Sequence, residues 1–339
     1  MNRDKPKRRR LREVIHAAIR ALREARVSFG HGTTNARDEA AYLTLHTLGL
    51  PLDTADWDIE VSTADAAKVE ALVKRRIRER TPAAYITHEA WLGEFRFYVD
   101  ERVIVPRSFI AELLVSDLAP WIAQPRRVQR ALDLCTGSGC LAVLLAHSFP
   151  RATVDAVDIS RDALAVARRN VKDYGLEGRV ALLRSDLYGG VTGRYDVIVS
   201  NPPYVTEEAM RALPVEYRRE PRIALAGGSD GLDLVRRILH EAPQHLEKDG
   251  WLVVEVGHAR KRVERAFPRL PLIWAETSAG NDCVFLISRE ALLEGLARST
   301  PATTEAASPR RSGARGAGRA SAGAAVRRNR NARVSGGSR

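Results

Sequence analysis

The sequence predicts a doubly wound α/β domain that follows a small helical domain and a β-hairpin. From residue 128 onward, strand-like apolar segments alternate with segments of helical periodicity, the pattern of a parallel sheet with helices on both faces. Before the hairpin, the chain shows helical periodicity alone. The expected division is a basic arm at 1–12, a helical domain at 13–85, a hairpin linker at 86–105, an α/β domain at 106–297 and a disordered tail at 298–339.

Three helices are expected in the helical domain. The segment "VIHAAIRAL" places its apolar residues on one face. Asn35 is a suitable N-cap for "ARDEAAYLTLHTL", and Gly49 and Pro51 end that helix. The third helix, "ADAAKVEALVKRRIRER", has a basic outer face. The next segment, "AWLGEFRFYVDERVIVPR", alternates apolar and polar residues and is expected to form a β-hairpin that turns at "VDER", residues 99–102.

The α/β domain is expected to contain six strands and three long helices. The strand-like segments are 128–134, 152–158, 179–186, 195–201, 250–257 and 282–288. The helix-like segments are 140–149, 161–175 and 231–246. In this architecture ligands bind beyond the carboxyl ends of the strands, so the residues that follow each strand are the candidates for a site.

Positive charge is concentrated at the two ends of the chain. Residues 1–12 hold seven Lys or Arg and one acid, and residues 300–339 hold nine Arg and one acid, which leaves the remainder close to neutral. A single basic binding face is therefore not indicated. The tail has almost no large apolar residue and is expected to be disordered, either with loose phosphate contacts to RNA or without a dedicated partner.

Other features exclude a secreted or membrane protein. No apolar segment of a secretory signal follows the basic N-terminus, and no run of about 18 apolar residues exists to span a membrane. The three cysteines, Cys135, Cys140 and Cys283, form no CxxC pair. This pattern fits a reducing cytoplasm and predicts no metal site.

Four consecutive strand ends carry polar groups or glycines. Gly137 and Gly139 follow the first strand and allow a ligand to approach the backbone and the next helix N-terminus. Asp158, after the second strand, is placed to accept both hydroxyls of a ribose. Asp186, after the third strand, is placed to read an adenine edge through its carboxylate or the neighbouring backbone. The fourth strand is followed by "NPPY", residues 201–204.

The glycine loop taken alone also fits a dinucleotide site, with Asp158 as the ribose acid, so an NAD enzyme is an alternative. A nicotinamide site, however, gives no reason for Asp186 and "NPPY" at the next two strand ends. A ligand made of adenosine and an amino acid needs one acid for the ribose, one polar group for the adenine and space for a methyl acceptor. That ligand is S-adenosylmethionine. Asp133, two residues before the loop, is expected to position it.

The residues of "NPPY" suit methyl transfer to a poor nucleophile. An amide nitrogen has its lone pair delocalised into the adjacent π-system. The side-chain oxygen of Asn201 and the carbonyl of Pro202 are each able to accept one N–H of such an NH₂ group. Tyr204 would flank the planar acceptor. Because the proton can leave after transfer, no strong base is required, and positioning supplies most of the rate enhancement.

Four motifs together carry a family resemblance. "DLCTGSGC", "VDIS", "SDLY" and "NPPYV" resemble those of the protein N(5)-glutamine methyltransferases, over about residues 28–292. The resemblance implies a Rossmann-like, class I S-adenosylmethionine-dependent methyltransferase. The segments "FYVDERVIVPRS", "GHGTTNARDEA" and "EPRIALAGGSDGLDLVRRIL" look like the branch that methylates a glutamine of the third large-subunit ribosomal protein (L-three). In that branch the helical domain and hairpin would recognise the substrate protein.

The resemblance also implies roles for particular residues. The residues implied to contact the cofactor are Cys135, Thr136, Gly137, Ser138 and Gly139 at the methionine part, Asp158 at the ribose, and Asp186 and Leu187 at the adenine. The residues implied to hold the glutamine amide are Asn201, Pro202, Pro203 and Tyr204. Phe109 departs from the pattern of the branch, where proline is expected.

Three alternative functions stay open at this point. A release-factor glutamine methyltransferase would use the same chemistry on another protein. A methyltransferase acting on adenine in DNA or RNA shares "NPPY", but it usually needs a sizeable basic surface, which the near-neutral middle of this chain does not offer. A non-catalytic RNA-binding protein would use only the basic ends, and it leaves the cofactor loop and "NPPY" without a role.

Overall fold

The computed structural model describes residues 8–299. Most of the expected basic arm and nearly all of the expected disordered tail lie outside this range. The helical region begins slightly earlier than expected, because Arg9–Arg10 form strand β1 and the first helix starts at Leu11. Within the described part of the arm, Arg8 pairs with Glu60 at 2.7 Å and Arg12 pairs with Asp58.

Four helices form the N-terminal region: α1 Leu11–Glu24, α2 Ala36–Leu48, α3 Thr63–Glu79 and α4 Ala83–Thr87. A two-residue strand, β2 (Glu60–Val61), pairs with β1 in an antiparallel bridge. The expected cap is present, since the side-chain oxygen of Asn35 accepts hydrogen bonds from the backbone N–H groups of Arg37 and Asp38. Gly49 ends α2 with a φ of 64°. The apolar faces of α1, α2 and α3 pack into one core.

The hairpin is present, but the expected turn is wrong. Strands β3 (Glu89–Leu92) and β4 (Phe95–Tyr98) pair with Leu92 opposite Phe95, so the turn consists of Gly93 and Glu94 rather than residues 99–102. A two-residue turn needs positive φ, and Gly93 supplies it with a φ of 59°. Residues 99–102 form a separate bend, in which Asp100 accepts hydrogen bonds from the backbone and side chain of Arg102.

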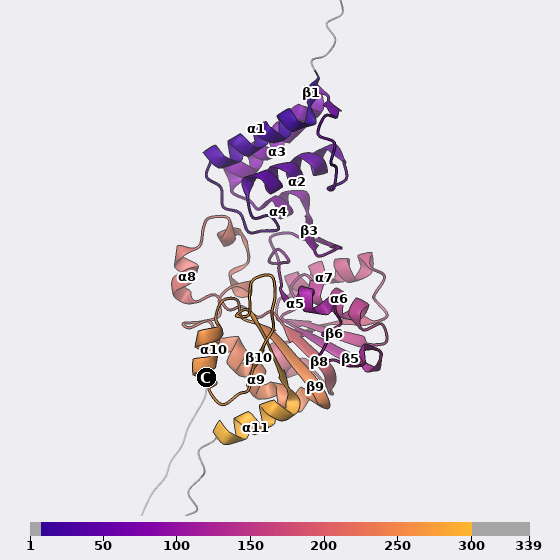
Figure 1. Ribbon diagram of the computed structural model, residues 1–339, viewed down its shortest axis with the longest axis vertical. Helices are drawn as coiled ribbons and strands as arrows, with labels where there is room; N and C mark the ends of the chain where they lie inside the picture. Colours follow the sequence, from indigo (N-terminus) through magenta and orange to yellow (C-terminus); the bar gives the residue numbers. More distant parts are fainter. Residues whose placement is uncertain (1–7, 300–339) are drawn as a thin grey trace, which may run out of the picture. The chain divides into compact units, whose positions relative to one another are not determined.

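A seven-stranded sheet forms the centre of the C-terminal region (Figure 1). Its strand order is β10-β11-β9-β8-β5-β6-β7. The strands are β5 Arg130–Leu134, β6 Thr153–Asp158, β7 Val180–Arg184, β8 Tyr195–Ser200, β9 Leu246–Glu255, β10 Ile273–Trp274 and β11 Val284–Ser288. Strands β5 to β9 are parallel, and β11 and β10 extend the sheet in antiparallel pairs. All six expected strands are present, and the short β10 was not expected.

Helices cover both faces of this sheet (Figure 1). One face packs against α5 (Ile110–Leu114) and α6 (Cys140–Ser148), with the end of α7 (Arg161–Asp173). The other face packs against α9 (Asp233–His245), α10 (Arg260–Ala266) and α11 (Arg289–Ser299). The three long helices were expected. The sequence analysis did not identify α5, α8 (Glu207–Ala212), α10 and α11; of these, α5, α8 and α10 have few turns in which periodicity is visible.

The strand order places two loops side by side. From β5 the chain moves outward through β6 and β7, then returns so that β8 pairs with the other side of β5. In the parallel β5–β8 pair, Leu134 lies opposite Ser200. The glycine loop after β5 and the "NPPY" segment after β8 therefore start next to each other, at the reversal point where doubly wound sheets bind ligands.

Among the described residues, no helix is long and apolar enough to cross a membrane.

We expect Asn35→Ala to lower the free energy of unfolding by about 1 kcal/mol, because α2 loses the acceptor for two N–H groups. Urea denaturation monitored by circular dichroism measures the change. Asn35→Ser, which keeps a capping oxygen, is the matched control and should stay close to the wild type. Equal midpoints for the alanine variant and the wild type would contradict this role for the cap.

Candidate active site

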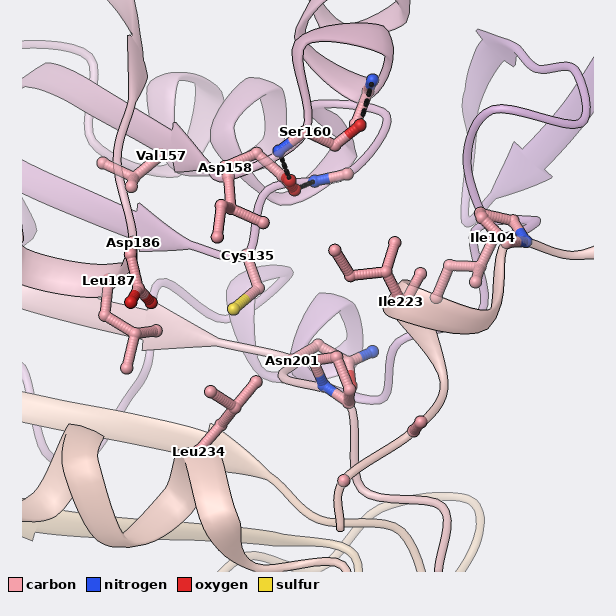
Figure 2. Close-up of a pocket in the computed structure, with 18 of the residues that line it drawn as sticks. Ile104, Cys135, Val157, Asp158, Ser160, Asp186, Leu187, Asn201, Ile223 and Leu234 are labelled. Atoms are coloured by element: carbon pink, nitrogen blue, oxygen red, sulfur yellow. Dashed lines mark hydrogen bonds between the residues drawn. The ribbon is translucent and has the colours of Figure 1, made fainter. Parts of the chain in front are cut away.

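A cavity of about 760 Å³ lies at the carboxyl ends of β5, β6, β7 and β8. Figure 2 shows side chains from these strand ends around it. We call this space the donor cavity. The expected site residues that line it are Cys135, Gly137, Asp158, Asp186, Leu187, Asn201 and Pro203. The tertiary structure thus brings together residues from all four strand ends.

The glycine loop needs an unusual backbone. Cys135, Gly137 and Gly139 have φ values of 61°, 55° and 79°. At Gly139 a Cβ atom would lie 3.1 Å from the Cβ of Ala167, so close packing of the loop on α7 also requires glycine. From the same helix, the side chain of Asn170 donates a hydrogen bond to the carbonyl of Ser138 at 2.8 Å. The loop is therefore held in one shape.

Asp133 is hydrogen-bonded to this loop through Thr136 and does not line the donor cavity. Its side chain is fully buried, and burial raises the pKa of the carboxyl to about 7. The hydroxyl of Thr136 donates to Asp133 Oδ2 at 2.5 Å. Thr136, Ser138 and Gly139 also lie outside the cavity lining, so these residues shape the loop while Cys135 and Gly137 face the cavity.

Asp158 is fixed at the cavity wall by two backbone groups. Gly137 N–H donates to Asp158 Oδ2 at 2.9 Å, and Ser160 N–H donates to Oδ1 at 2.8 Å (Figure 2). Burial raises the pKa of this carboxyl, and the backbone hydrogen bonds act in the opposite direction. Each carboxylate oxygen retains a further lone pair, so Asp158 can still accept a hydrogen bond from a hydroxyl group of a ligand.

An apolar slot lies beside Asp186, near the carboxyl end of β7. Val157, Leu187 and Leu234 line it (Figure 2). Asp186 is paired with Arg237 of α9 at 2.9 Å. A slot with apolar walls and polar groups at its edge suits a flat heteroaromatic base. The sequence analysis missed the contributions of Leu234 and Arg237, although "GLDLVRRIL" was among the quoted segments.

A second, smaller cavity lies next to the donor cavity. It measures about 170 Å³ and is lined by all four residues of the "NPPY" motif, together with residues from other segments. Asn201 and Pro203 line both cavities, so the two spaces meet at the motif. We call the smaller space the acceptor pocket. At the base of the motif, the hydroxyl of Ser200 donates to the carbonyl of Leu134 at 2.9 Å, which ties β8 to the start of the glycine loop.

Tyr204 is packed tightly in this pocket. At Gly257, which follows β9, a Cβ atom would lie 2.7 Å from Cε2 of the Tyr204 ring. Only glycine leaves room for the ring. Burial raises the pKa of the Tyr204 hydroxyl far above its ordinary value, so the side chain is a neutral phenol.

Residues far apart in the chain complete the acceptor pocket, and the sequence analysis assigned them no role. Arg107 and Tyr217 line it, with the guanidinium carbon of Arg107 5.8 Å from the Tyr217 ring centroid. Glu220 accepts two hydrogen bonds from the guanidinium of Arg107, at 2.5 and 2.7 Å, and one from Val105 N–H at 3.0 Å. The only sequence signal was that Arg107 and Glu220 belong to the segments quoted for the family branch; Tyr217 lies outside those segments.

Glu255, at the end of β9, holds the segment that enters the pocket. Its Oε2 atom accepts hydrogen bonds from the Ser108 hydroxyl at 2.6 Å and from Phe109 N–H at 2.8 Å. Burial raises the pKa of the Glu255 carboxyl to about 7. Proline at position 109 would have no N–H to donate, so the departure noted in the sequence adds one hydrogen bond to this loop.

Outside both cavities, the structure brings His258, Asp282 and Cys283 together, with one donor atom of each within 4.8 Å of the others. The sequence analysis had not connected these residues, because they come from two separate loops.

Comparison with known proteins places the chain among methyltransferases. The family model of the methyltransferase small domain matches residues 110–216, and that of the PrmC N-terminal domain matches residues 13–87. The ribosomal protein uL3 glutamine methyltransferase of Neisseria gonorrhoeae is 55% identical over 285 residues, covering 84% of this chain and 95% of that protein. The protein of the same name from Bordetella pertussis is 55% identical, covering 83% and 96%. Among solved structures, a ribosomal protein L11 methylase from Lactobacillus delbrueckii matches with 22% identity and a TM-score of 0.40, covering 56% of this chain and 83% of that chain.

The buried Glu255 predicts a specific pH dependence of stability. Its folded-state pKa of about 7 lies above its ordinary value of 4.5, so the stability associated with the neutral carboxyl is complete below pH 4.5 and is lost as the pH rises to about 7. Glu255→Gln stays neutral and keeps an acceptor oxygen. We expect its free energy of unfolding, relative to the wild type, to increase by on the order of 3 kcal/mol between pH 4.5 and pH 8.

Urea denaturation of both proteins across this pH range measures the difference, and subtraction removes the contribution of the other buried carboxyls. A constant difference between the variant and the wild type would show that Glu255 has the same pKa in the folded and unfolded states.

Proposed function

The chain belongs to the family of ribosomal protein uL3 glutamine methyltransferases, and we propose on that premise that it methylates the side-chain amide nitrogen of one glutamine in ribosomal protein uL3. The methyl donor is S-adenosylmethionine. The observation that carries the proposal is that Asn201 and Pro203 line both the donor cavity and the acceptor pocket. A methyl donor in the first space and an amide in the second would meet at Asn201.

The lining of the donor cavity fits the three parts of S-adenosylmethionine. Asp158 would accept hydrogen bonds from the ribose hydroxyls, since its carboxylate is already oriented by Gly137 and Ser160. The apolar slot of Val157, Leu187 and Leu234 would hold the adenine, with Asp186 at its edge. Cys135 and Gly137 would face the methionine part. The role of Asp133 is then to hold the loop through Thr136 rather than to touch the cofactor.

The acceptor pocket fits an unbranched side chain that ends in a planar amide. Asn201 Oδ1 and the Pro202 carbonyl would each accept one N–H of the glutamine NH₂ group. With both hydrogens held, the face of the amide nitrogen would point toward the donor cavity. Tyr204, a neutral phenol packed against Gly257, would flank the amide plane. Pro203 fixes the backbone between these groups.

The bound cofactor supplies an electrophilic methyl group on a sulfonium. Transfer forms one N–C bond as one S–C bond breaks, and it leaves S-adenosylhomocysteine and a transiently cationic N-methyl amide. The amide proton then passes to solvent. The chain itself contributes orientation, for which effective molarities correspond to roughly 7–11 kcal/mol of the barrier. Tyr204 and the buried walls of the pocket also limit access of water to the reacting groups.

A ribosomal protein substrate would place the reaction in the cytoplasm, with free uL3 or an assembly intermediate as the partner. The basic N-terminus and the Arg-rich tail would add RNA contacts in such an intermediate. These segments lie mainly outside the described residues.

The proposal is tested with the full-length protein, methyl-labelled S-adenosylmethionine and ribosomal proteins from a strain that lacks this enzyme. Peptide mass spectrometry then locates the label. We expect label on one glutamine of uL3. Label on a release factor instead would keep the chemistry and change the substrate, and label in nucleic acid alone would overturn the proposed amide acceptor.

Asn201→Ala removes one of the two acceptors for the amide. We expect kcat to fall by about 100-fold or more, the size of effect seen when one preorganised polar contact to a reacting group is removed. The dissociation constant for S-adenosylmethionine should change by less than about tenfold, because Asp158 and the apolar slot remain. Glu208→Ala, an exposed position on α8, is the control. Near-normal turnover of the Asn201 variant would remove Asn201 from the mechanism.

Asp158→Ala tests the donor cavity separately. Loss of a hydrogen-bonding carboxylate should weaken S-adenosylmethionine binding by about 10- to 100-fold, measured by isothermal titration calorimetry. Asp162→Ala, an exposed acid in the first turn of α7, is the matched control and should bind like the wild type. Unchanged affinity in the Asp158 variant would contradict the ribose role.

A further inference from the structure

A third cavity of about 550 Å³, which we call the polar groove, lies beside the donor cavity. It is formed where the end of α3, the segment after α4, the bend after β4 and the 3₁₀ turn Tyr217–Arg219 come together. No motif in the sequence pointed to it, because these segments are up to about 140 residues apart, as shown by the hydrogen bond from Arg219 to the carbonyl of Glu79. Its volume lies within the usual range of ligand-binding pockets in proteins.

One short segment connects the three spaces. Arg102 lines both the polar groove and the donor cavity. Two residues later, Ile104 lines both the donor cavity and the acceptor pocket. Arg107 then lines the acceptor pocket alone. If a polypeptide inserts one side chain into the acceptor pocket, residues only a few positions away in that polypeptide can therefore reach the polar groove.

The charges that line the groove are mostly neutralised by partners within the protein. Arg75 pairs with Glu79 at 3.0 Å, and Arg102 pairs with Asp100 at 2.6 Å. Arg219 donates to the carbonyl at the end of α3. Glu101 differs: among residues 8–299 it has no ion pair and no hydrogen bond from its side chain, and it is exposed. Among the described residues, Glu101 is thus the one acid of the groove without a cationic partner, while Arg219 is held by a backbone carbonyl and has no acidic partner.

A negative charge with no internal partner selects the class of ligand. RNA phosphates would be repelled by Glu101, Arg75 and Arg102 are already paired with acids, and Arg219 is already bound to a backbone carbonyl. A lysine or arginine side chain would find an open partner in Glu101. Proteins that bind ribosomal RNA neutralise phosphates with Lys and Arg, so such side chains are abundant in the substrate class of the proposed function.

We propose that the polar groove binds the stretch of the substrate protein that flanks the modified glutamine, with Glu101 receiving one of its lysine or arginine side chains. This inference rests on the proposed function, because it takes a ribosomal protein as the occupant. The groove contributes to selection of the substrate protein, whereas Asn201 and the acceptor pocket select the glutamine. The contact is made at the surface, so it acts on substrate binding rather than on the transfer step.

The test compares Glu101→Gln with Glu94→Gln in full-length enzyme acting on intact uL3. Glu94 is the matched control, since it is an exposed acid in the β3–β4 turn, outside the groove, with no ion pair or side-chain hydrogen bond among the described residues. We expect Glu101→Gln to raise KM about threefold to fivefold, as for an exposed ion pair, and this difference should shrink at high salt. Glu94→Gln should show the KM of the wild type.

Charge exchange gives a second readout that a structural defect would not reproduce. Each lysine or arginine near the modified glutamine of uL3 is replaced by glutamate, and each substrate is assayed with the wild type and with Glu101→Lys. One substrate should be poor for the wild type and should regain a lower KM with Glu101→Lys, because the reversed pair restores the attraction. Competition with ribosomal RNA fragments should act equally on Glu101→Gln and Glu94→Gln.

Each outcome is distinct. If Glu101→Gln and Glu94→Gln have the same KM and no charge exchange restores activity, the groove proposal is wrong while the proposed function stands. If RNA competes more strongly with Glu101→Gln than with Glu94→Gln, loss of the negative charge favours a phosphate ligand, and the groove binds nucleic acid instead. If the wild type transfers no methyl group to uL3 at all, the proposed function itself fails.

Discussion

The parallel pairing of β8 with β5 is the constraint on which the site depends. It places Ser200 opposite Leu134, and the Ser200 hydroxyl donates to the Leu134 carbonyl at the point where both strands end. The loop that shapes the donor cavity and the "NPPY" segment that forms the acceptor pocket start from these two residues. A change of register between β5 and β8 would move the two loops apart, and neither cavity would then share Asn201 with the other.

The far wall of the acceptor pocket depends instead on ion pairs whose carboxylates are buried and whose arginines are partly exposed. Glu216 accepts a hydrogen bond from Ser28 N–H and pairs with Arg80 at 3.2 Å, so the N-terminal helices hold the wall segment. Glu220 pairs with Arg107, and His31 packs against Tyr217 with tilted rings whose centroids are 4.2 Å apart. Buried ion pairs add little net stability because both charges lose water, and their directional bonds serve instead to specify one arrangement. The helical region therefore supports the wall of the pocket, although none of its residues lines the pocket.

Burial also shifts the pKa values of several ionisable groups near the site toward their neutral forms. It raises the pKa of Asp133 and Glu255 to about 7 and lowers that of His31 to about 4. Each of these side chains holds or packs against a loop of the site. A methyl transfer that needs no strong base leaves such groups free for structural roles.

The sequence by itself determined the central strands, the long helices, the Asn35 cap, the glycine loop and Asn201, because each depends on local chemistry: periodicity, positive φ, capping oxygens and the rigidity of consecutive prolines. It placed the hairpin turn wrongly, since "VDER" and "GE" are both acceptable turns and strand pairing chose between them. Only the tertiary structure decided the Arg107–Glu220 pair, the apolar slot with Leu234, the anchoring of Phe109 by Glu255, and the polar groove around Glu101. The partners in these features are far apart in the chain, and no local pattern states which distant segments will pack together.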